Sequence, residues 1–245
     1  YSVANEISHS INKFKIIITK STVPVTTGDE IEKILSKKID KDKFSIVSNP
    51  EFLREGEAIR DFIYPDRVVI GTNDKKSATK LRNLYSPLIS KGAKFISTNR
   101  RAAELIKYAS NAFLATKITF INEIANLCEK VDVNVDDVAL GIGLDKRIGS
   151  RFLRAGPAYG GSCFPKDVKA LVKSGEDLNF KFEILSAVLK VNQEQKTILF
   201  PKIKNFIFRT RPPTADDQSN ESEAFQLAGD KWPQVGVSLY NHTSN

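Results

Sequence analysis

RAAELIKYASNAFLATKITFINEIANLCEKV, residues 101–131, is the stretch that decides the fold. It contains no Gly or Pro, and its apolar side chains recur at helical spacing. They cover more than one narrow stripe, so we expect one long helix that is packed on two sides. Cys128 lies on the apolar face and is interpreted as a core residue. A helix of this length divides the chain into a part before it and a part after it.

The part before the long helix alternates between strand and helix patterns. The chain opens at Tyr1 inside a helical pattern. Runs rich in β-branched residues occupy 14–19, 44–48, 67–72 and 93–97, and helical patterns lie at 28–38 and from about Ser77 to Leu88. Strands that alternate with helices indicate a parallel α/β sheet. Residues 1–99 are therefore predicted to be an α/β domain.

The part after the long helix is predicted to be α-helical. Asn134 caps a short helix, a glycine-rich loop region extends from Gly141 to Gly161, and helices resume at 165–174 and about 181–206. Residues 100–206 then form a helical domain. Residues 207–245 have a disordered composition and are left as an unassigned, irregular tail.

Composition excludes several classes of site. The chain has 245 residues, a net charge of +8, two Cys and two His. So few ligands argue against a disulfide scaffold, a zinc site and a Ser-His-Asp triad, and we expect no metal. No apolar run is long enough to span a membrane and no secretory signal is present, so we expect a cytoplasmic protein without a membrane partner.

The excess of basic side chains lies outside the tail and favours an anionic partner. A basic stripe interleaved with aromatic residues is missing, so we expect no nucleic-acid partner, whereas a phosphorylated metabolite fits. A solubilising surface is the plainer alternative. The chain contains no Met, so we expect a fragment or a processed chain.

The most informative segment is Tyr159-Gly160-Gly161-Ser162-Cys163-Phe164-Pro165-Lys166-Asp167. Pro165 suits the first turn of a helix, so Cys163 would precede a helix N-terminus, where the dipole favours a thiolate. Lys166 adds positive charge, and Asp167 follows one turn on. The segment is compatible with a covalent site and equally with a buried structural cysteine.

Ser-Asn-Pro-Glu-Phe-Leu-Arg-Glu-Gly, residues 48–56, follows a predicted strand, where ligands bind in parallel sheets. Glu51 and Glu55 could serve as an acid/base and a polar anchor, or belong to an acidic first helical turn. Lys20-Ser21-Thr22 also follows a strand, and an ordinary turn is the alternative.

Lys107 and Asn111 lie four residues apart on the long helix and share a face with Glu104. An amine and an amide on this otherwise apolar helix could point into a site. A polar stripe that faces solvent is the alternative, and the helix pattern alone favours it.

Taken together, these segments resemble the nucleotide-sugar dehydrogenase family over roughly residues 1–200. The resemblance is carried by KSTVP (20–24), SNPEFLREG (48–56), YPDRVVIG (64–71), AELIKYASNAFLATKITFINE (103–123), DKRIG (145–149), FLRAGP (152–157) and GGSCFPKD (160–167). The last motif is similar to that of the branch that oxidises UDP-glucose, because GDP-mannose enzymes usually have Leu at the position of Phe164. Enzymes that form N-acetylmannosaminuronate usually have His before the Cys.

The resemblance implies an NAD-dependent, four-electron oxidation of UDP-glucose to UDP-glucuronate through a cysteine thiohemiacetal and thioester, in polysaccharide biosynthesis. The alternatives are another nucleotide-sugar dehydrogenase of the GDP-mannose or UDP-N-acetyl-hexosamine type, or a non-catalytic module that binds UDP-sugar. The family resemblance also implies a partial Rossmann-like sheet and a homodimer or higher homo-oligomer built on the long helix.

The resemblance also assigns roles to residues. Cys163 would be the nucleophile, Asp167 and Lys107 would activate water and stabilise the oxyanion, and Asn111, Glu51 and Thr22 would assist. The residues matched to UDP-sugar binding are Phe52, Leu53, Arg54, Arg147, Phe152, Leu153, Arg154, Tyr159 and Gly160; those matched to the cofactor are Thr22, Glu55 and Lys166.

Two departures from the family pattern concern the ends of the chain. No Gly-x-Gly-x-x-Gly turn is present, and residues 207–245 do not match the family's second nucleotide-binding domain. We therefore expect a fragment that lacks the dinucleotide-binding motif and most of the C-terminal domain. Such a chain would bind NAD poorly by itself.

Overall fold

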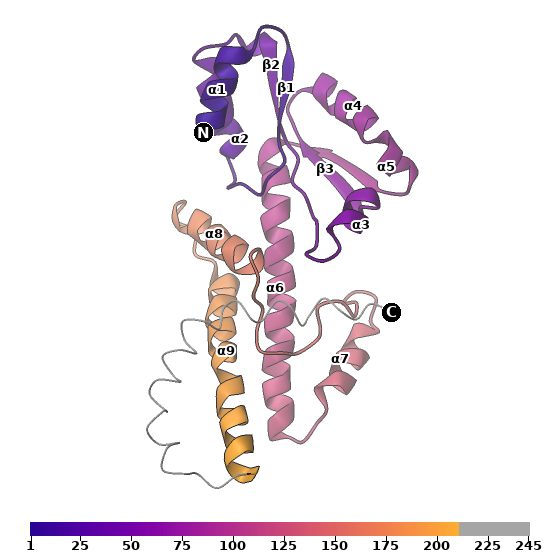
Figure 1. Cartoon of the computed structure of the whole chain (residues 1–245), viewed down its shortest axis with the longest axis vertical. Coiled ribbons are helices and arrows are strands. Elements are labelled where there is room, and N and C mark those ends of the chain that lie inside the picture. Colours follow the sequence, from indigo (N-terminus) through magenta and orange to yellow (C-terminus); the bar gives the residue numbers. More distant parts are fainter. Residues whose placement is uncertain (211–245) are drawn as a thin grey trace. The chain divides into compact units, whose positions relative to one another are not determined.

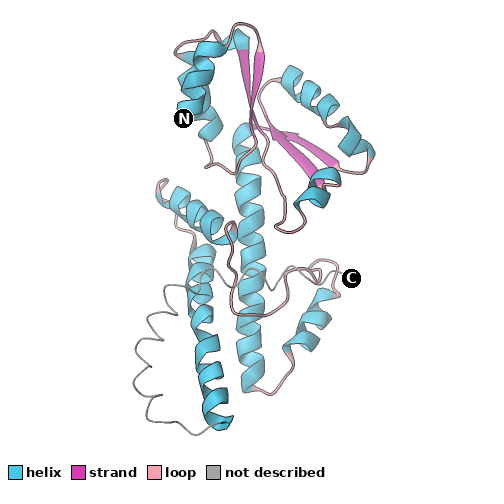
Figure 2. Cartoon of the chain, viewed as in Figure 1, coloured by secondary structure: helices cyan, strands magenta, loops and turns pink. Residues whose placement is uncertain are grey.

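The structure is a computed structural model that describes residues 1–210, with side chains described as far as residue 205. It comprises two compact units, Tyr1–Ser110 and a second that begins at Asn111. The first unit contains the strands, and the described part of the second is helical (Figure 2). Residues 211–245, which hold most of the predicted irregular tail, lie outside the described residues.

The first unit is built on a sheet with the strand order β1-β2-β3-β4. The strands are β1 (Lys15–Thr19), β2 (Phe44–Ser48), β3 (Arg67–Gly71) and β4 (Lys94–Thr98). β1 pairs with β2 in parallel, and β3 with β4 likewise. β2 and β3 meet only at Ser48 and Gly71 and run antiparallel. The predicted parallel α/β sheet is therefore confirmed in the main, with one antiparallel junction between β2 and β3 that was not expected.

Helices cover both faces of this sheet. They are α1 (Ser2–Ser10), α2 (Thr27–Ser36), α3 (Ala58–Ile63), α4 (Lys75–Leu84) and α5 (Ser86–Ser90), with a short 3-10 turn, η1, at Lys41–Lys43. Alternate residues of β2 supply the two cores: Ile46 packs with Leu35 of α2, and Val47 with Leu81 of α4. This alternation follows from the strand period of two, and it gives the three-layer arrangement of an α/β domain (Figure 1).

The helix predicted from Ser77 to Leu88 is interrupted at Tyr85. Pro87 lies in the first turn of α5, where its missing N–H would otherwise break the helical ladder. The start of α4 was also misplaced by two residues, because the carboxylate of Asp74 caps it by accepting from the N–H groups of Lys76 and Ser77.

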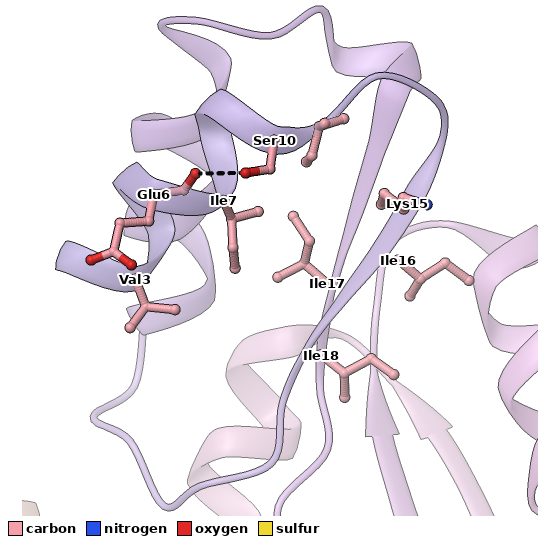
Figure 3. A pocket seen from close by; sticks show the side chains of 9 residues that line it. Val3, Glu6, Ile7, Ser10, Lys15, Ile16, Ile17 and Ile18 are labelled. Atoms are coloured by element: carbon pink, nitrogen blue, oxygen red, sulfur yellow. Dashed lines mark hydrogen bonds between the residues drawn. The ribbon is translucent and has the colours of Figure 1, made fainter.

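The outer edge of β1 borders an open, largely apolar pocket of about 560 Å³. α1 contributes Val3 and Ile7, and β1 contributes Ile17 and Ile18 (Figure 3). Ile18 remains 37% exposed, and no strand among the described residues pairs with this edge of β1.

The second unit consists of helices and one long loop. α6 (Arg100–Lys130) continues into it from the first unit and is followed by α7 (Val135–Gly143), α8 (Phe164–Glu176) and α9 (Glu183–Thr210). The side chain of Asn134 accepts from Asp136 N–H, which confirms the predicted cap of α7. Cys128 is 5% exposed, which confirms its core assignment. α9 extends to Thr210, so residues 207–210, expected to belong to the tail, are helical.

Candidate active site

Cys163 is the N-cap residue of α8, and Pro165 lies in the first turn. This confirms the predicted position of the thiol at a helix start. The thiol is exposed, in contrast to that of Cys128. The hydroxyl of Ser162 lies 3.7 Å from Sγ of Cys163. A reagent can therefore reach Cys163 from solvent, and a structural core cysteine is excluded.

The carboxylate of Asp167 lies one turn along α8 and is 1% exposed. Its Oδ2 accepts a hydrogen bond of 2.6 Å from Nδ2 of Asn111 on α6. Nζ of Lys166 lies 3.3 Å from Oδ1. An amide donor and an ammonium group thus hold this buried carboxylate, which follows the cysteine by one helical turn. Asp167, Asn111 and Lys166 thus meet as a polar cluster at the start of α8.

An aromatic trio surrounds this helix start. The ring of Phe164 makes edge-to-face contacts with Phe152 and Tyr159, each with centroids 6.2 Å apart. Tyr159 is 4% exposed, and burial raises its pKa to about 12. Leu153 is also buried, whereas Arg154 is exposed and Gly160 is half-buried.

Arg147 lies on the surface of the loop after α7 and is paired with Asp145. Its side chain is 89% exposed, with Nη2 2.6 Å from Oδ2 of Asp145. Lys117 of α6 donates to the carbonyl oxygens of Ile148 and Gly149 at 3.0 and 3.3 Å. The loop is therefore tied to α6, while Arg147 projects outward.

The first unit contains a second cluster, in which Lys107 is 4% exposed. Its Nζ lies 3.6 Å from Oε1 of Glu51 and 5.4 Å from the centroid of the Phe52 ring. The guanidinium of Arg67 lies 4.0 Å from the same ring. Burial lowers the pKa of Lys20, against the opposing effect of the Glu51 carboxylate. The Glu51 carboxylate thus lies near the amines of Lys107 and Lys20.

The solvent-facing alternative for Lys107, Asn111 and Glu104 was wrong, because all three side chains are buried. The segment before α3 is also not an acidic first helical turn, since no helix includes Glu51 or Glu55.

Among the other predicted residues of the first unit, Leu53 joins this cluster, because its N–H donates to Oε2 of Glu51 at 2.6 Å. Arg54 is bound to Asp61, with Nη2 2.6 Å from Oδ1 and Nε 2.9 Å from Oδ2. The hydrogen bonds from Arg54 hold the pKa of Asp61 below its usual value despite partial burial. Leu53 and Glu55 are exposed, and Thr22 is half-buried in the loop after β1.

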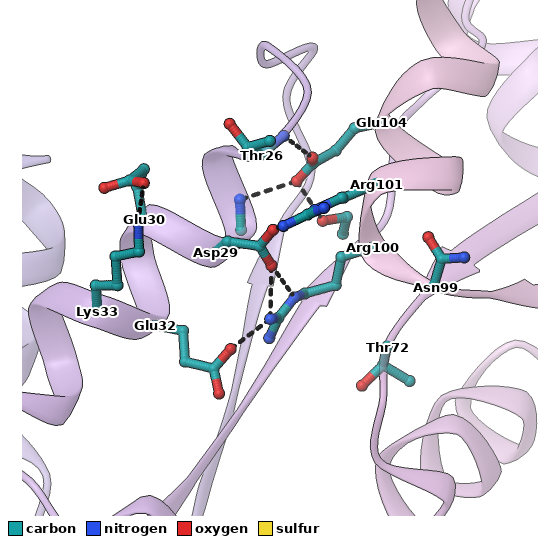
Figure 4. A network of polar contacts seen from close by, with 12 residues as sticks. Thr26, Asp29, Glu30, Glu32, Lys33, Thr72, Asn99, Arg100, Arg101 and Glu104 are labelled. Atoms are coloured by element: carbon teal, nitrogen blue, oxygen red, sulfur yellow. Dashed lines mark hydrogen bonds and ion pairs between the residues drawn. The ribbon is translucent and has the colours of Figure 1, made fainter.

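A buried carboxylate that sequence reasoning did not single out organises this unit. Glu104, 3% exposed, accepts hydrogen bonds from Thr26 N–H at 2.8 Å, Gly28 N–H at 2.9 Å and the Ser48 hydroxyl at 2.8 Å (Figure 4). We call these contacts the Glu104 clasp. It joins α6 to the start of α2 and to the end of β2, and therefore to the loops that bear Thr22 and Glu51.

Comparison with known proteins gives the family. Residues 101–194 match the central domain of the UDP-glucose/GDP-mannose dehydrogenase family, and residues 1–89 match its NAD binding domain. The chain belongs to this family. A UDP-glucose 6-dehydrogenase of Rhizobium meliloti is 52% identical over 205 residues, which are 83% of this chain and 47% of that protein. UDP-glucose 6-dehydrogenase YwqF of Bacillus subtilis is 50% identical over 82% of this chain and 46% of its own length.

The fold agrees with the same family. The structure of a UDP-glucose dehydrogenase from Pyrobaculum islandicum superposes with a TM-score of 0.74 at 41% identity, over 79% of this chain and 45% of that one. The chain thus spans about half the length of the relatives it matches. Among the residues that the structure describes, no helix combines the length and apolar composition needed to cross a bilayer.

NAD is the cofactor of this dehydrogenase family, and the first unit fits it only in part. Dinucleotides place their pyrophosphate at the N-terminus of a helix that follows a strand. At the only such start between β1 and β2, that of α2, the donors of Thr26 and Gly28 are already taken by Glu104. These two N–H groups of the β1–α2 turn are therefore not free to bind a pyrophosphate. Thr22 and Glu55, on loops after β1 and β2, remain candidates for contacts elsewhere on the cofactor.

Proposed function

We propose that this chain supplies the covalent centre of a UDP-glucose 6-dehydrogenase, which converts UDP-glucose to UDP-glucuronate. The observation that carries the proposal is the exposed Cys163 at the start of α8, with the buried Asp167–Asn111 pair one turn on, in a chain half identical to enzymes of that name. The Phe164 of the cysteine motif favours UDP-glucose over GDP-mannose as the substrate.

The chain's own residues account for the covalent steps. The Cys163 thiolate adds to the C6 aldehyde and forms a carbon–sulfur bond, while the carbonyl electrons move to oxygen and take up a proton. After oxidation to the thioester, water adds to C6, the carbon–sulfur bond breaks, and the thiolate and the carboxylate product separate. The start of α8 favours the thiolate in both steps. When bound, NAD would accept the hydride lost from C6 in each of the two oxidations.

Proton transfer in the hydrolytic step is assigned to Asp167. Its Oδ2 is occupied by Asn111, whereas Oδ1 makes no hydrogen bond among the described residues and lies near Lys166. Oδ1 is buried and is the carboxylate oxygen that these contacts leave without a hydrogen bond, so we assign to it the proton of the attacking water. The buried amine of Lys107, 3.6 Å from Oε1 of Glu51, is assigned the stabilisation of the developing oxyanion.

Phe52, Arg54, Phe152, Arg154 and Tyr159 are proposed to line the UDP-sugar site, together with Leu53, Arg147 and Gly160. We propose a cytoplasmic enzyme, since nucleotide sugars and NAD are the metabolites it would use.

Self-association through α6 is part of the proposal. Apolar side chains lie exposed at seven-residue intervals along this helix: Phe113 at 66%, Phe120 at 50% and Leu127 at 56%. A spacing of seven keeps them on one face, which suits a helix of a second copy. The proposed partner is therefore another molecule of this chain.

The experiment separates the covalent centre from the cofactor site. UDP-glucose and its C6 aldehyde are each incubated with the chain in a Cys128→Ser background, and the rate of Cys163 alkylation by iodoacetamide is measured. The aldehyde is expected to protect Cys163 by at least about tenfold and UDP-glucose to protect it less, because only the aldehyde can form the thiohemiacetal. Equal rates with and without the aldehyde would overturn the proposed nucleophile.

Absorbance at 340 nm with UDP-glucose and NAD completes the test. We expect slow or no NADH formation by this chain, since two N–H groups at the start of α2 are not free to bind a pyrophosphate, and none in the Cys163→Ser variant. A UDP-sugar-binding module without turnover is the second candidate, and the Glu104 clasp favours it for this chain in isolation.

A further inference from the structure

The loop that leads to Cys163 contains neither helix nor strand between α7 and α8. Part of its backbone is buried, and buried N–H and C=O groups require partners. The partners are amide side chains that project from α6 and α9 into the interior of the second unit. Their exposed fractions are 0% for Asn122, 5% for Asn192 and 6% for Gln195.

Asn192 of α9 binds both backbone groups of Tyr159. Its Oδ1 accepts from Tyr159 N–H at 2.8 Å, and its Nδ2 donates to the Tyr159 carbonyl oxygen at 3.1 Å. A single side chain thus pairs with this residue as a neighbouring strand would. Tyr159 lies four residues before Cys163.

Gly156 is bound in the same way by two side chains. Its N–H donates to Oδ1 of Asn122 at 2.8 Å, and its carbonyl oxygen accepts from Nε2 of Gln195 at 2.9 Å. Oε1 of Gln195 in turn accepts from Nδ2 of Asn126 at 2.8 Å. Nδ2 of Asn122 has no partner among the described residues. A buried amide with an unpaired donor is costly, and the hydrogen bond from Gly156 N–H offsets part of that cost.

Ala158 lies between these two anchored residues and has a φ of 118°. L side chains rarely adopt this conformation, and it persists only where the surroundings impose it. Four hydrogen bonds impose it here, two to the backbone of Gly156 before Ala158 and two to the backbone of Tyr159 after it. They fix the direction in which the chain enters Gly160 and Gly161, and hence the approach to Cys163.

We propose that Asn192, Gln195 and Asn122 are positioning residues for the nucleophile: they hold the loop so that Cys163 stays at the N-terminus of α8. This inference rests on the proposed function, in which Cys163 reacts. Their hydrogen bonds to the loop, in the described part of the chain, go to the backbone of Gly156 and Tyr159 and not to Cys163, so they act through that backbone. Without them, the loop would move and the thiol would spend less time in the field of the helix.

The test replaces one atom of the Asn192 side chain, its Nδ2, by oxygen, and it uses a matched control variant. Asn192→Asp keeps the acceptor for Tyr159 N–H but turns an oxygen toward the Tyr159 carbonyl. Gln193→Glu adds the same charge at the adjacent, exposed position, which makes no contact among those described. Both are made in a Cys128→Ser background, and the rate of Cys163 alkylation by iodoacetamide is measured from pH 4 to pH 8.5. Thermal unfolding establishes that each variant is folded.

At pH 8.5, Asn192→Asp is expected to slow alkylation by about two- to fivefold, the size of a helix-dipole effect on a thiolate. Gln193→Glu is expected to match the parent. As pH falls, the introduced carboxyl takes up a proton that it can donate to the Tyr159 carbonyl. Because burial raises the pKa of such a group, the ratio to the parent should return toward one between about pH 7 and pH 4.

A folded Asn192→Asp variant that reacts at the parent rate would overturn the proposal, as would equal slowing in both variants, which would indicate a charge effect. If Asn192→Asp does not fold, Gln195→Glu provides the same test at the Gly156 carbonyl and is judged by the same criteria. Alkylation needs neither UDP-glucose nor NAD. Failure of the C6 aldehyde to protect Cys163 would therefore refute the proposed function while leaving this test intact.

Discussion

Replacing Glu104 by Gln should measurably destabilise the first unit. Oε1 accepts from Gly28 N–H and the Ser48 hydroxyl, and Oε2 accepts from Thr26 N–H. The amide of Gln can place its oxygen where Oε1 of Glu104 lies, but its NH₂ group then takes the place of Oε2. This NH₂ group is a donor that faces the Thr26 N–H, which is also a donor. One charge-assisted hydrogen bond is lost and the remaining two become neutral, a cost of about 2–3 kcal/mol.

Urea unfolding followed by far-UV circular dichroism measures this change in the free energy of unfolding. Glu123→Gln is the matched control, because Glu123 lies on the same helix, is exposed and makes no contact among those described. It should change stability by less than about 0.5 kcal/mol. If Glu104→Gln also falls within about 0.5 kcal/mol of the parent, the Glu104 clasp does not stabilise the unit and the reasoning is refuted.

Three further predictions concern packing, association and pH. Gly71→Ala should lower the free energy of unfolding in urea by about 1–3 kcal/mol, because the new Cβ would lie 2.6 Å from atoms near the start of α6. Gly141→Ala should raise it by about 0.5–1 kcal/mol, because Gly141 lies in an open part of α7. Changes of the same sign in both variants would contradict this reasoning. Phe120→Glu should shift the chain toward monomer in size-exclusion chromatography with light scattering, and an unchanged mass would count against association through α6. Because Arg54 lowers the pKa of Asp61, this ion pair contributes stability above about pH 4, and that contribution is lost as the pH falls further. Asp61→Asn should therefore make the free energy of unfolding depend less on pH in the acid range. A pH dependence equal to that of the parent would show that the pair contributes nothing.

Local patterns predicted much of the fold. Strand β2 was placed at 44–48, where the structure has it, because a short run with β-branched and aromatic residues ends at Asn49-Pro50. The direction of β3 could not be predicted, since a period of two is the same for parallel and antiparallel strands. The break at Tyr85 could have been predicted from Pro87 alone, so this error lay in the interpretation and not in the sequence.

The candidate site was also predictable from the sequence only in part. Cys163, Pro165 and Asp167 lie within one helical turn, and their spacing alone indicated their arrangement. Glu104 was noticed only as sharing a face with Lys107, because its partners Thr26 and Ser48 are 78 and 56 residues away. No periodicity in a single sequence links such distant positions. Asn192 and Gln195 were missed because their partners are also distant in the sequence. In addition, amides on a helix usually face solvent, so their positions in the sequence did not indicate burial.

The amide anchors also set the order in which the chain can mature during synthesis. Asn192 is 33 residues beyond Tyr159, and Gln195 is 39 beyond Gly156. At about 5–20 residues per second, a ribosome adds these anchors roughly 2–8 s after the loop itself has been made. During that interval Cys163 is present on a nascent chain whose loop has no anchors from α9. By the same reasoning, the thiol is less ionised during that interval than in the finished chain, so Cys163 reaches its full reactivity only after α9 has been made.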